Sequence, residues 1–501
     1  MSPFMQFIDN GKRFQCPFCE DITTVPQEYF NHLDHMGKRV DYYERPELCL
    51  GSYEFVATKE YCHNNQLPTP PAFIFMIDVS CHSFRSGLLD VLCPYIKDVI
   101  LPNLPRDYAA NNQQKQANTD IRVGFVTYDK ELHFYNLKST LAAPQMMIVS
   151  DIDEVFVPIL DGFLVNLNES KQVIDLLLDQ IPIMFKDNAE TELILGPVVE
   201  AGIEALKSAK CCGKLFVFHS NLPNALAQGQ LKNRDGDKKL LGTDKEKNIL
   251  SPQSDYYANL GKKCVENQCS LDLFMLPNQY CDIASISDLT RKTSGQIYKY
   301  DYFQADTHGK RLCDDLKYAI DNTVAFDAVM KVRTSTGIKP IDYLGNFNLN
   351  GYDVELAGLS KQTSMCVELK HEDKLNENTK VYIQLALLYT SLSGQRRIRV
   401  HNLSLNVCSQ YSQMFISCDV DALINYMAKL ACRSVTVSSP KSIRDNLINQ
   451  VANILACYRK NCTNAPSKGQ FILPETLKLL PVFSNSVLKS DAIAGCKFNL
   501  Y

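Results

Sequence analysis

The chain has 501 residues, which at about 150 residues per domain predicts roughly three to four domains. Its composition, 45% hydrophobic and 22% charged, is that of a globular protein and disfavours disordered or collagen-like architectures. A net charge of -4 excludes a global electrostatic footprint for nucleic acid or an anionic membrane. We find no apolar run long enough to span a bilayer and no signal peptide, and we expect the 19 cysteines to be mostly reduced thiols of a cytosolic protein.

Residues 1–40 contain one CxxC motif, Cys16-Pro17-Phe18-Cys19. Its spacing lets two thiolates hold one zinc ion, but a structural site uses four ligands. His32 and His35 complete the pattern C-x2-C-x12-H-x2-H, yet two residues between histidines place them poorly on one helical face. The region also lacks the basic density of nucleic-acid readers. We therefore predict a partial zinc finger with Cys16 and Cys19 as metal ligands, and no nucleic-acid binding.

Residues 41–70 are interpreted as a linker, because three prolines within four residues, at 68–71, mark a boundary. An apolar run follows at 72–77 and ends in Asp78, and it reads as a strand buried on both faces. Similar runs recur at 121–126, 214–219 and 271–276, with helical patterns between them. This alternation predicts a doubly wound α/β domain over residues 71–312.

Beyond residue 320 the pattern changes to short alternating runs separated by turns containing Gly and Asn. These runs lie at 326–333, 352–356, 364–369, 381–388 and 397–402. They predict a β-sandwich over residues 320–408. Helical periodicity returns from Asp419, with Asp419 and Ser442 as candidate caps, and predicts an incomplete helical domain over 415–501. The fold class is therefore multidomain α/β plus β.

The segment Asp78-Val79-Ser80-Cys81-His82-Ser83 resembles the D-x-S-x-S metal site of von Willebrand A-type domains. Here the third position is His82, and a neutral imidazole is a poor ligand for Mg²⁺. We expect Asp78 to be a satisfied turn residue that caps the next helix. Nucleotide-binding, serine-hydrolase and zinc-protease motifs are missing, and Cys211, Cys212 and His219 read as structural, so we predict that the chain is not an enzyme.

Several segments, read in order, resemble the COPII coat cargo-adaptor subunit, the Sec24 family, in its C/D-type branch. The matching segments are 3–8, Cys16 to Cys19, 45–48, 71–80, 121–128, 143–147, 161–165, 326–337, 394–397, 425–429 and 457–460. The resemblance covers practically all of the chain. It implies a zinc finger, a von Willebrand A-like trunk, a β-sandwich and a helical domain, whereas the family's gelsolin-like domain is absent from this sequence.

Family members carry a second CxxC before the segment that starts at Pro3 here, so the resemblance implies that Cys16 and Cys19 are half of a four-Cys zinc site in a chain truncated at both ends. It also implies a non-catalytic subunit that works with a Sec23 coat subunit and a Sar-type small GTPase. Such a subunit binds short export signals of cargo and SNARE proteins, and it contacts anionic membrane peripherally at endoplasmic reticulum exit sites and on COPII vesicles. The cargo-binding residues stay unknown at this point.

Three alternatives remain open. The α/β domain is a metal-dependent adhesion-type binding module if Asp78 and Ser80 hold a divalent ion. The chain is an enzyme of unknown class if one of its cysteines is an activated nucleophile. It is a non-functional product if truncation exposes a sheet edge and apolar helix surface.

Overall fold

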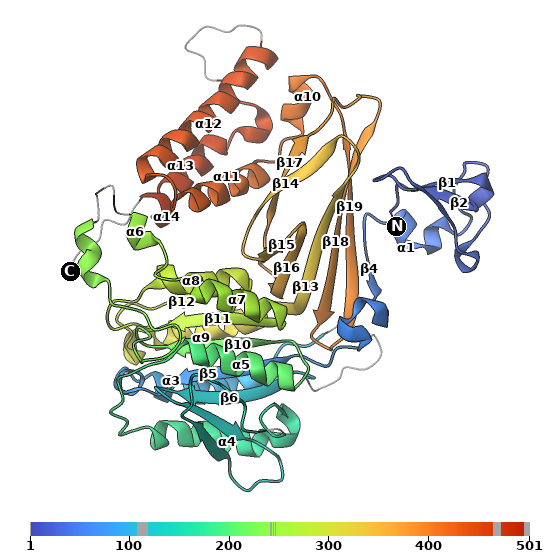
Figure 1. Cartoon of the computed structure of the whole chain (residues 1–501). Coiled ribbons are helices and arrows are strands. Elements are labelled where there is room, and N and C mark those ends of the chain that lie inside the picture. Colours follow the sequence, from blue (N-terminus) through green and yellow to red (C-terminus); the bar gives the residue numbers. More distant parts are fainter. Residues whose placement is uncertain are drawn as a thin grey trace.

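A computed structural model describes residues 2–107, 119–159, 161–240, 243, 245, 247–463 and 472–494, which form four packed regions (Figure 1). The N-terminal module, residues 2–49, holds a three-stranded antiparallel sheet and one short helix. Its elements are β1 (Gln6–Ile8), β2 (Arg13–Gln15), β3 (Ile22–Thr24) and α1 (Pro46–Cys49). The module lies beside the central sheets, where the Phe4 ring stacks on Tyr382 with centroids 4.7 Å apart.

The α/β region, residues 72–321, is built on an eight-stranded sheet. The strands are β5 (Ala72–Asp78), β6 (Arg122–Tyr128), β7 (Leu132–Asn136), β8 (Gln145–Val149), β9 (Val165–Asn166), β10 (Gly213–His219), β11 (Cys269–Met275) and β12 (Ile297–Lys299). Their order is β12-β11-β10-β5-β6-β7-β8, with β9 paired to β6. Strands β7 and β9 run antiparallel to β6, and β8, which is antiparallel to β7, runs in the same direction as β6. The four strands predicted from apolar runs are thereby confirmed as β5, β6, β10 and β11.

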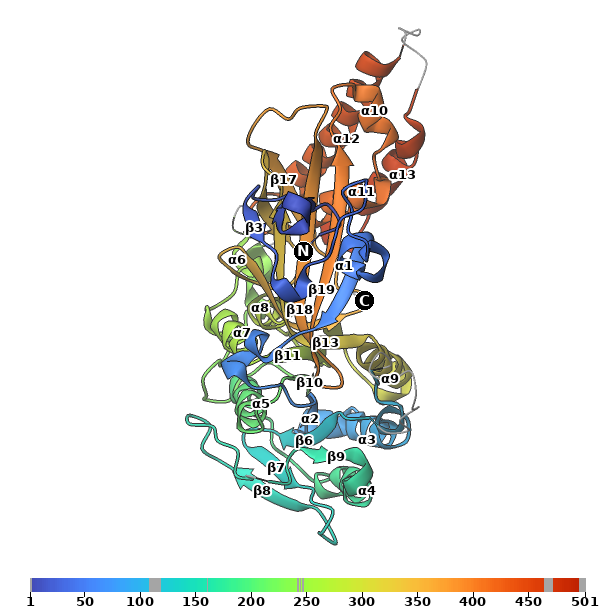
Figure 2. The ribbon, with the colours of Figure 1, turned by 90° about the vertical axis from the view of Figure 1, so that its right-hand side faces the viewer.

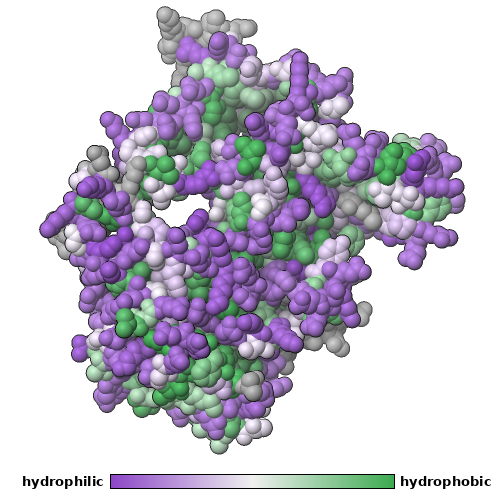
Figure 3. Space-filling model, viewed as in Figure 1, coloured by the Kyte–Doolittle hydropathy of each residue, from purple (hydrophilic) through white to green (hydrophobic). Residues whose placement is uncertain are grey.

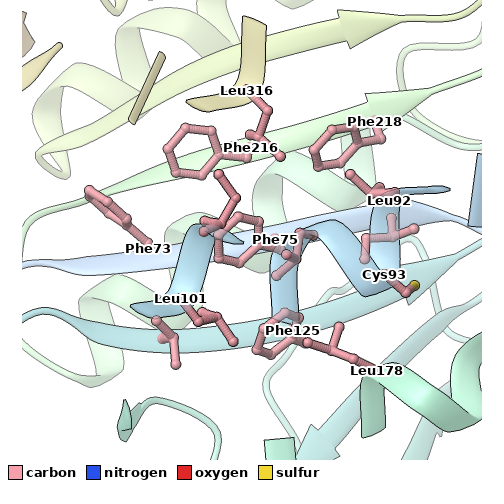
Figure 4. Packing of buried hydrophobic residues seen from close by; sticks show 14 of the residues in the cluster. Phe73, Phe75, Leu92, Cys93, Leu101, Phe125, Leu178, Phe216, Phe218 and Leu316 are labelled. Carbon is pink, nitrogen blue, oxygen red and sulfur yellow. The ribbon is translucent and has the colours of Figure 1, made fainter. Parts of the chain in front are cut away.

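Helices cover both faces of this sheet, so its strands are apolar on both sides. Helices α3 (Leu88–Tyr95), α4 (Leu167–Met184) and α9 (Ala305–Asp321) pack on one face, and α5 (Gly196–Ser208), α7 (Tyr256–Glu266) and α8 (Ile283–Lys292) on the other. Alternate residues of β5 serve the two layers: Phe73 and Phe75 point to the first face, Ile74 and Met76 to the second. Figure 4 shows the phenylalanines of the first face. Each such burial contributes about 1.5–3 kcal/mol.

A six-stranded antiparallel sheet and a two-stranded sheet form the sandwich region. The strands are β4 (Ser52–Val56), β13 (Thr323–Thr334), β14 (Ile338–Leu344), β15 (Asn348–Asn350), β16 (Asp353–Ser360), β17 (Cys366–His371), β18 (Lys380–Ser391) and β19 (Arg396–Asn406). The larger sheet has the order β15-β16-β13-β18-β19-β4, and β14 pairs with β17. Five runs predicted as strands correspond to β13, β16, β17, β18 and β19, whereas β14 and β15 were missed.

Strand β4 corrects the interpretation of residues 41–70 as a linker. Its five residues pair antiparallel with β19, as in the register of Phe55 with Ile398 and of Tyr53 with Val400. A five-residue strand in a mostly polar segment carries little local signal, and its partner lies more than 340 residues away. Only the fold reveals that this segment is the edge of the sandwich sheet.

The helical region packs against the β14–β17 side of the sandwich (Figures 1 and 2). Its helices are α10 (Tyr411–Ile416), α11 (Val420–Ser434), α12 (Pro440–Cys462), α13 (Leu480–Leu488) and α14 (Asp491–Ala494). Asp419 caps α11 as predicted, accepting from the N–H groups of Asp421 and Ala422. The second predicted cap was wrong: Ser439 caps α12 by accepting from the Ser442 N–H, because Pro440 already occupies the first turn. Within the described ranges, no helix is long and apolar enough to cross a bilayer.

Candidate metal knuckle and binding surfaces

Cys16 and Cys19 lie in one tight turn between β2 and β3. The Cys16 N–H donates to the Asp21 carbonyl at 3.0 Å, and the Glu20 N–H donates to the Cys16 carbonyl at 3.0 Å. Burial raises the pKa of the Cys16 thiol, but hydrogen bonds from the Cys19 and Phe18 N–H groups and from the Cys19 thiol hold that pKa below its ordinary value. The hydrogen bond from the Asp21 N–H lowers the pKa of the Cys19 thiol, but its contact with Cys16 and its desolvation outweigh that bond and raise the pKa instead. Backbone N–H groups that favour a thiolate are suited to a soft cation such as zinc.

Two thiols are half of the ligands that a tetrahedral zinc site needs. Across the residues that the structure describes, no group of three or more His, Cys, Asp and Glu side chains is placed to hold a metal ion. His32 does not join the pair; its ring packs against Phe30 with centroids 5.4 Å apart. The described residues therefore fit zinc through Cys16 and Cys19 only, and they do not complete a four-ligand site.

The carboxyl end of β5 does not present a free carboxylate to a divalent cation. Asp78 is fully buried, and its Oδ1 accepts from the Ser80 N–H at 2.8 Å. Its Oδ2 accepts from the N–H and the hydroxyl of Ser220 at 2.8 and 2.5 Å. Asp78 is thus satisfied as predicted, but the expected cap was wrong, since its donors come from the turn and from Ser220 rather than from α2 (Cys81–Arg85).

The segment that follows α4 closes over the same strand end. The Asn188 amide donates to the Val79 carbonyl at 2.9 Å, and the Cys81 N–H donates to the Glu190 carbonyl at 2.8 Å. An adhesion-type metal site needs an open position for its ligand's carboxylate. The geometry around Asp78 therefore does not favour the metal-dependent adhesion alternative.

The cysteines and the histidine weighed for catalysis are buried without an activating partner. Burial raises the pKa of Cys211 to about 11 and that of Cys212 well above its ordinary value. Burial lowers the pKa of His219 to about 4. An activated nucleophile needs a depressed thiol pKa or a base within hydrogen-bond reach, and these thiols show the opposite shift.

An open cavity of about 630 Å³ lies on the outer face of the sandwich sheet; we call it the sheet cavity. Its lining residues are Tyr29, Arg45, Glu47, Tyr53, Phe55, Tyr61, Val329, Lys331, Arg333, Asp353, Gln384, Ala386, Leu388, Ile398 and Val400. Alternation places Ala328 and Met330 in the sandwich core, so their neighbours Val329 and Lys331 face outward into the cavity.

Strand register explains why this face is hollow. One row of cross-strand neighbours runs through Val329, Leu388, Ile398 and Phe55. The next row runs through Lys331, Ala386, Val400 and Tyr53. The small Ala386 side chain stands between larger neighbours and leaves the floor open. The result is an apolar floor of about the size that small-ligand and short-peptide sites occupy.

Charged side chains surround this floor, and most of them are already paired. Lys331 pairs with Asp353 at 2.9 Å, and Glu47 accepts from the Tyr29 hydroxyl at 2.5 Å. Arg333 has no ion-pair partner within the described part of the chain, and it also lines a neighbouring cavity of about 410 Å³ together with Cys16 and Cys19. One cation is therefore available to a ligand's carboxylate.

Sequence reasoning singled out none of the sheet-cavity residues. The available signal was the strand pattern Val329-x-Lys331-x-Arg333, which puts one apolar and two basic side chains on the same face. The aromatic residues of the cavity wall are Tyr29 and residues of the segment interpreted as a linker, including Tyr61. No local sequence pattern indicates that these residues contact strand β13.

The outer edge of the α/β sheet is a second exposed surface. Among the residues that the structure describes, strand β8 pairs only with β7, and its Met146, Met147 and Ile148 side chains are 39%, 38% and 53% exposed. Hydrophobic side chains also gather over this lower part of the molecule in Figure 3. An apolar edge strand with unpaired backbone groups is suited to pairing with another chain.

Four family models match the chain in order along its length. They are the Sec23/Sec24 zinc finger at residues 1–29, the Sec23/Sec24 trunk domain at 68–320, the Sec23/Sec24 beta-sandwich domain at 325–408 and the Sec23/Sec24 helical domain at 419–499. The zinc finger model implies zinc, whereas no group of three or more possible ligands comes together among the described residues.

Similar proteins include two human transport proteins. Protein transport protein Sec24C is 57% identical over 98% of this chain and 44% of its own length, and Sec24D is 51% identical over 98% and 47%. The crystal structure of the human COPII-coat protein Sec24c has a TM-score of 0.90 at 56% identity, covering 98% of this chain and 64% of that one. The chain spans about half the length of these curated relatives.

Proposed function

Because the chain belongs to the Sec23/Sec24 family, with Sec24C and Sec24D among its most similar relatives, we propose that it is a cargo-selecting subunit of the COPII inner coat in endoplasmic reticulum to Golgi transport. It captures short export signals on the cytoplasmic tails of cargo and SNARE proteins. It works with a Sec23 coat subunit and a Sar-type small GTPase, and it contacts the anionic membrane of exit sites peripherally.

The sheet cavity is the observation that carries this proposal. Its floor spans four neighbouring strands, β4, β19, β18 and β13, so an extended peptide of a few residues can lie across it. The floor takes apolar side chains, the Tyr53 and Phe55 rings flank it, and Arg333 offers one cation to an acidic residue. Apolar pockets with a few convergent polar groups are the ordinary form of a peptide-signal site.

We propose the β8 edge as the surface for the Sec23 subunit. Backbone pairing along the edge gives affinity, and the exposed Met146, Met147 and Ile148 add apolar contact area. The Sec23 subunit shares the trunk fold by family, so its own sheet edge is a partner of matching geometry.

Cys16 and Cys19 are proposed as zinc ligands, supported by their shared turn and the backbone N–H groups around Cys16. A four-ligand zinc site needs two further ligands besides Cys16 and Cys19. The role of the metal is structural, and none of the binding steps above passes through it. The buried, unactivated cysteines support a non-catalytic scaffold.

Peptide binding tests the proposal. The probes are fluorescein-labelled octapeptides that carry Ile-x-Met, the short SNARE signal that the resemblance to the C/D-type branch implies, with and without a glutamate. They are titrated against the chain and against Arg333→Glu. We expect the glutamate peptide to bind at least about tenfold more weakly to the variant, or about 1.4 kcal/mol. Lys370→Glu, at an exposed basic position on β17, is the matched control and should bind normally. If the glutamate peptide bound wild type and Arg333→Glu with equal affinity, the sheet cavity would not be the peptide-binding site.

A further inference from the structure

Arg39 is a buried cation in the small N-terminal module. Its side chain is 1% exposed. Removing a guanidinium from water costs several kcal/mol unless its donors are paired. Here Nε and Nη2 donate to the two carboxylate oxygens of Asp41 at 2.8 and 2.7 Å, and Nη1 donates to the Tyr29 carbonyl at 2.6 Å. A buried ion pair is weak evidence for net stability, and we infer that this one defines a single arrangement of the module.

The flat faces of the Arg39 guanidinium are occupied by aromatic rings. Its central carbon lies 4.2 Å from the Tyr29 ring centroid and 5.5 Å from that of Phe7. Arg45 lies 5.0 Å from the same Tyr29 ring and donates to the same Asp41 carboxylate at 3.1 Å. Tyr29 is therefore held through its backbone carbonyl and its ring at once.

Tyr29 connects this arrangement to the sheet cavity. Its hydroxyl donates to Glu47 Oε1 at 2.5 Å, and Tyr29, Arg45 and Glu47 together form the side of the cavity that the N-terminal module contributes. Burial raises the pKa of the Tyr29 phenol, with Glu47 adding to the shift, so the hydroxyl stays protonated and keeps donating. Arg39 itself does not line the cavity.

We propose that Arg39 is a positioning residue for the sheet cavity: it fixes the Tyr29 ring, and through Tyr29 the wall that faces the bound signal. This inference rests on the proposed function for its biological meaning. A purely structural Arg39 would stabilise the module without setting the position of Tyr29. Lysine cannot replace it, since an ammonium has neither the bidentate fork nor the flat face.

The absence of tryptophan from the sequence permits a direct test. Tyr29→Trp introduces a single fluorophore at the ring that Arg39 holds. The double change Arg39→Met with Asp41→Asn is then added, because removing both charges avoids leaving a buried carboxylate unpaired. We expect a red-shifted emission, stronger acrylamide quenching, and at least fivefold weaker binding of the Ile-x-Met peptide. Arg13→Met with Asp9→Asn, an exposed ion pair in the same module, should change neither.

Unchanged emission and quenching of the tryptophan after loss of Arg39 would overturn the proposal, whether or not any peptide binds. A peptide that fails to bind the wild-type chain contradicts the proposed function instead, so the two failures are distinguishable. If the double change melts the module, as seen by circular dichroism, Arg39→Lys replaces it. That variant keeps the charge for Asp41, and it should show the same spectral shift with a native melting curve. An unshifted spectrum there would equally refute the positioning role.

Discussion

Among single residues, His219 shows how burial in the α/β region fixes a protonation state. The Tyr128 hydroxyl donates to the Phe218 carbonyl at 2.7 Å, so its oxygen accepts from the Nδ1–H of a neutral His219 at 3.1 Å. Nε2 is buried and has no hydrogen-bond partner among the described residues. A second proton on this ring would be both desolvated and unpaired, which is why burial lowers the His219 pKa to about 4.

This shift predicts acid sensitivity. The unfolded chain takes up a proton on His219 below about pH 6.5, whereas the folded chain does so only below about 4. The free energy of unfolding should therefore fall by roughly 3 kcal/mol as the pH drops through that window. Urea unfolding at pH 7, 6, 5 and 4.5 should show a shallower loss for His219→Phe. If the free energy of unfolding fell equally with pH in the wild type and in His219→Phe, the result would contradict this account.

At the scale of elements, the two edge strands β4 and β8 differ in how far other side chains cover them. Strand β4 closes one side of the sheet cavity, and its Glu54 is anchored by the Tyr389 hydroxyl at 2.5 Å and by Arg399 at 2.8 Å. Strand β8 has no comparable polar cover, since four of its five residues are exposed. An uncovered apolar edge is an aggregation hazard unless a partner occupies it.

Ile148→Asp tests the role of β8. A charge on the edge should weaken association with a Sec23 subunit at least about tenfold, because it must be desolvated in the interface. Folding should be unaffected, since Ile148 is 53% exposed. Analytical ultracentrifugation of the mixed proteins measures the change. Leu405→Asp, at a comparably exposed apolar position on β19, is the control, and an equal loss in both variants would argue against the β8 surface.

The turn between β18 and β19 fixes the segment that joins β4 to β5. Gly394 has φ +79°, and a Cβ placed there would lie 2.9 Å from the Pro70 nitrogen and 3.0 Å from the Thr69 carbonyl carbon. Gly394→Ala should cost about 1–3 kcal/mol of unfolding free energy through left-handed strain, with the clash adding to it. Gly351→Ala, with φ +62° and open space around it, is the matched control for strain alone. If both variants lost the same unfolding free energy, the contact between the turn and the segment joining β4 to β5 would not contribute to stability.

At the scale of the whole molecule, the elements that could be predicted from the sequence are those that have a local hydrophobic pattern of their own. Six consecutive apolar residues before Asp78, preceded by prolines, indicate a strand covered on both faces, and β5 is that strand. Strand β4 escaped prediction because its hydrogen-bond partners lie on β19. The sheet cavity escaped for the same reason, since Tyr29, Phe55, Arg333 and Val400 meet only after four strands are aligned. Cys16 and Cys19 were visible because a CxxC motif is local.

Co-expression of the chain with a Sec23 coat subunit, followed by size-exclusion chromatography with zinc measured across the peak, tests the coat assignment most directly. The account predicts one peak with equimolar subunits, with zinc co-eluting. A chain that elutes alone or aggregates, while the Sec23 subunit stays soluble, would contradict its role as a coat subunit.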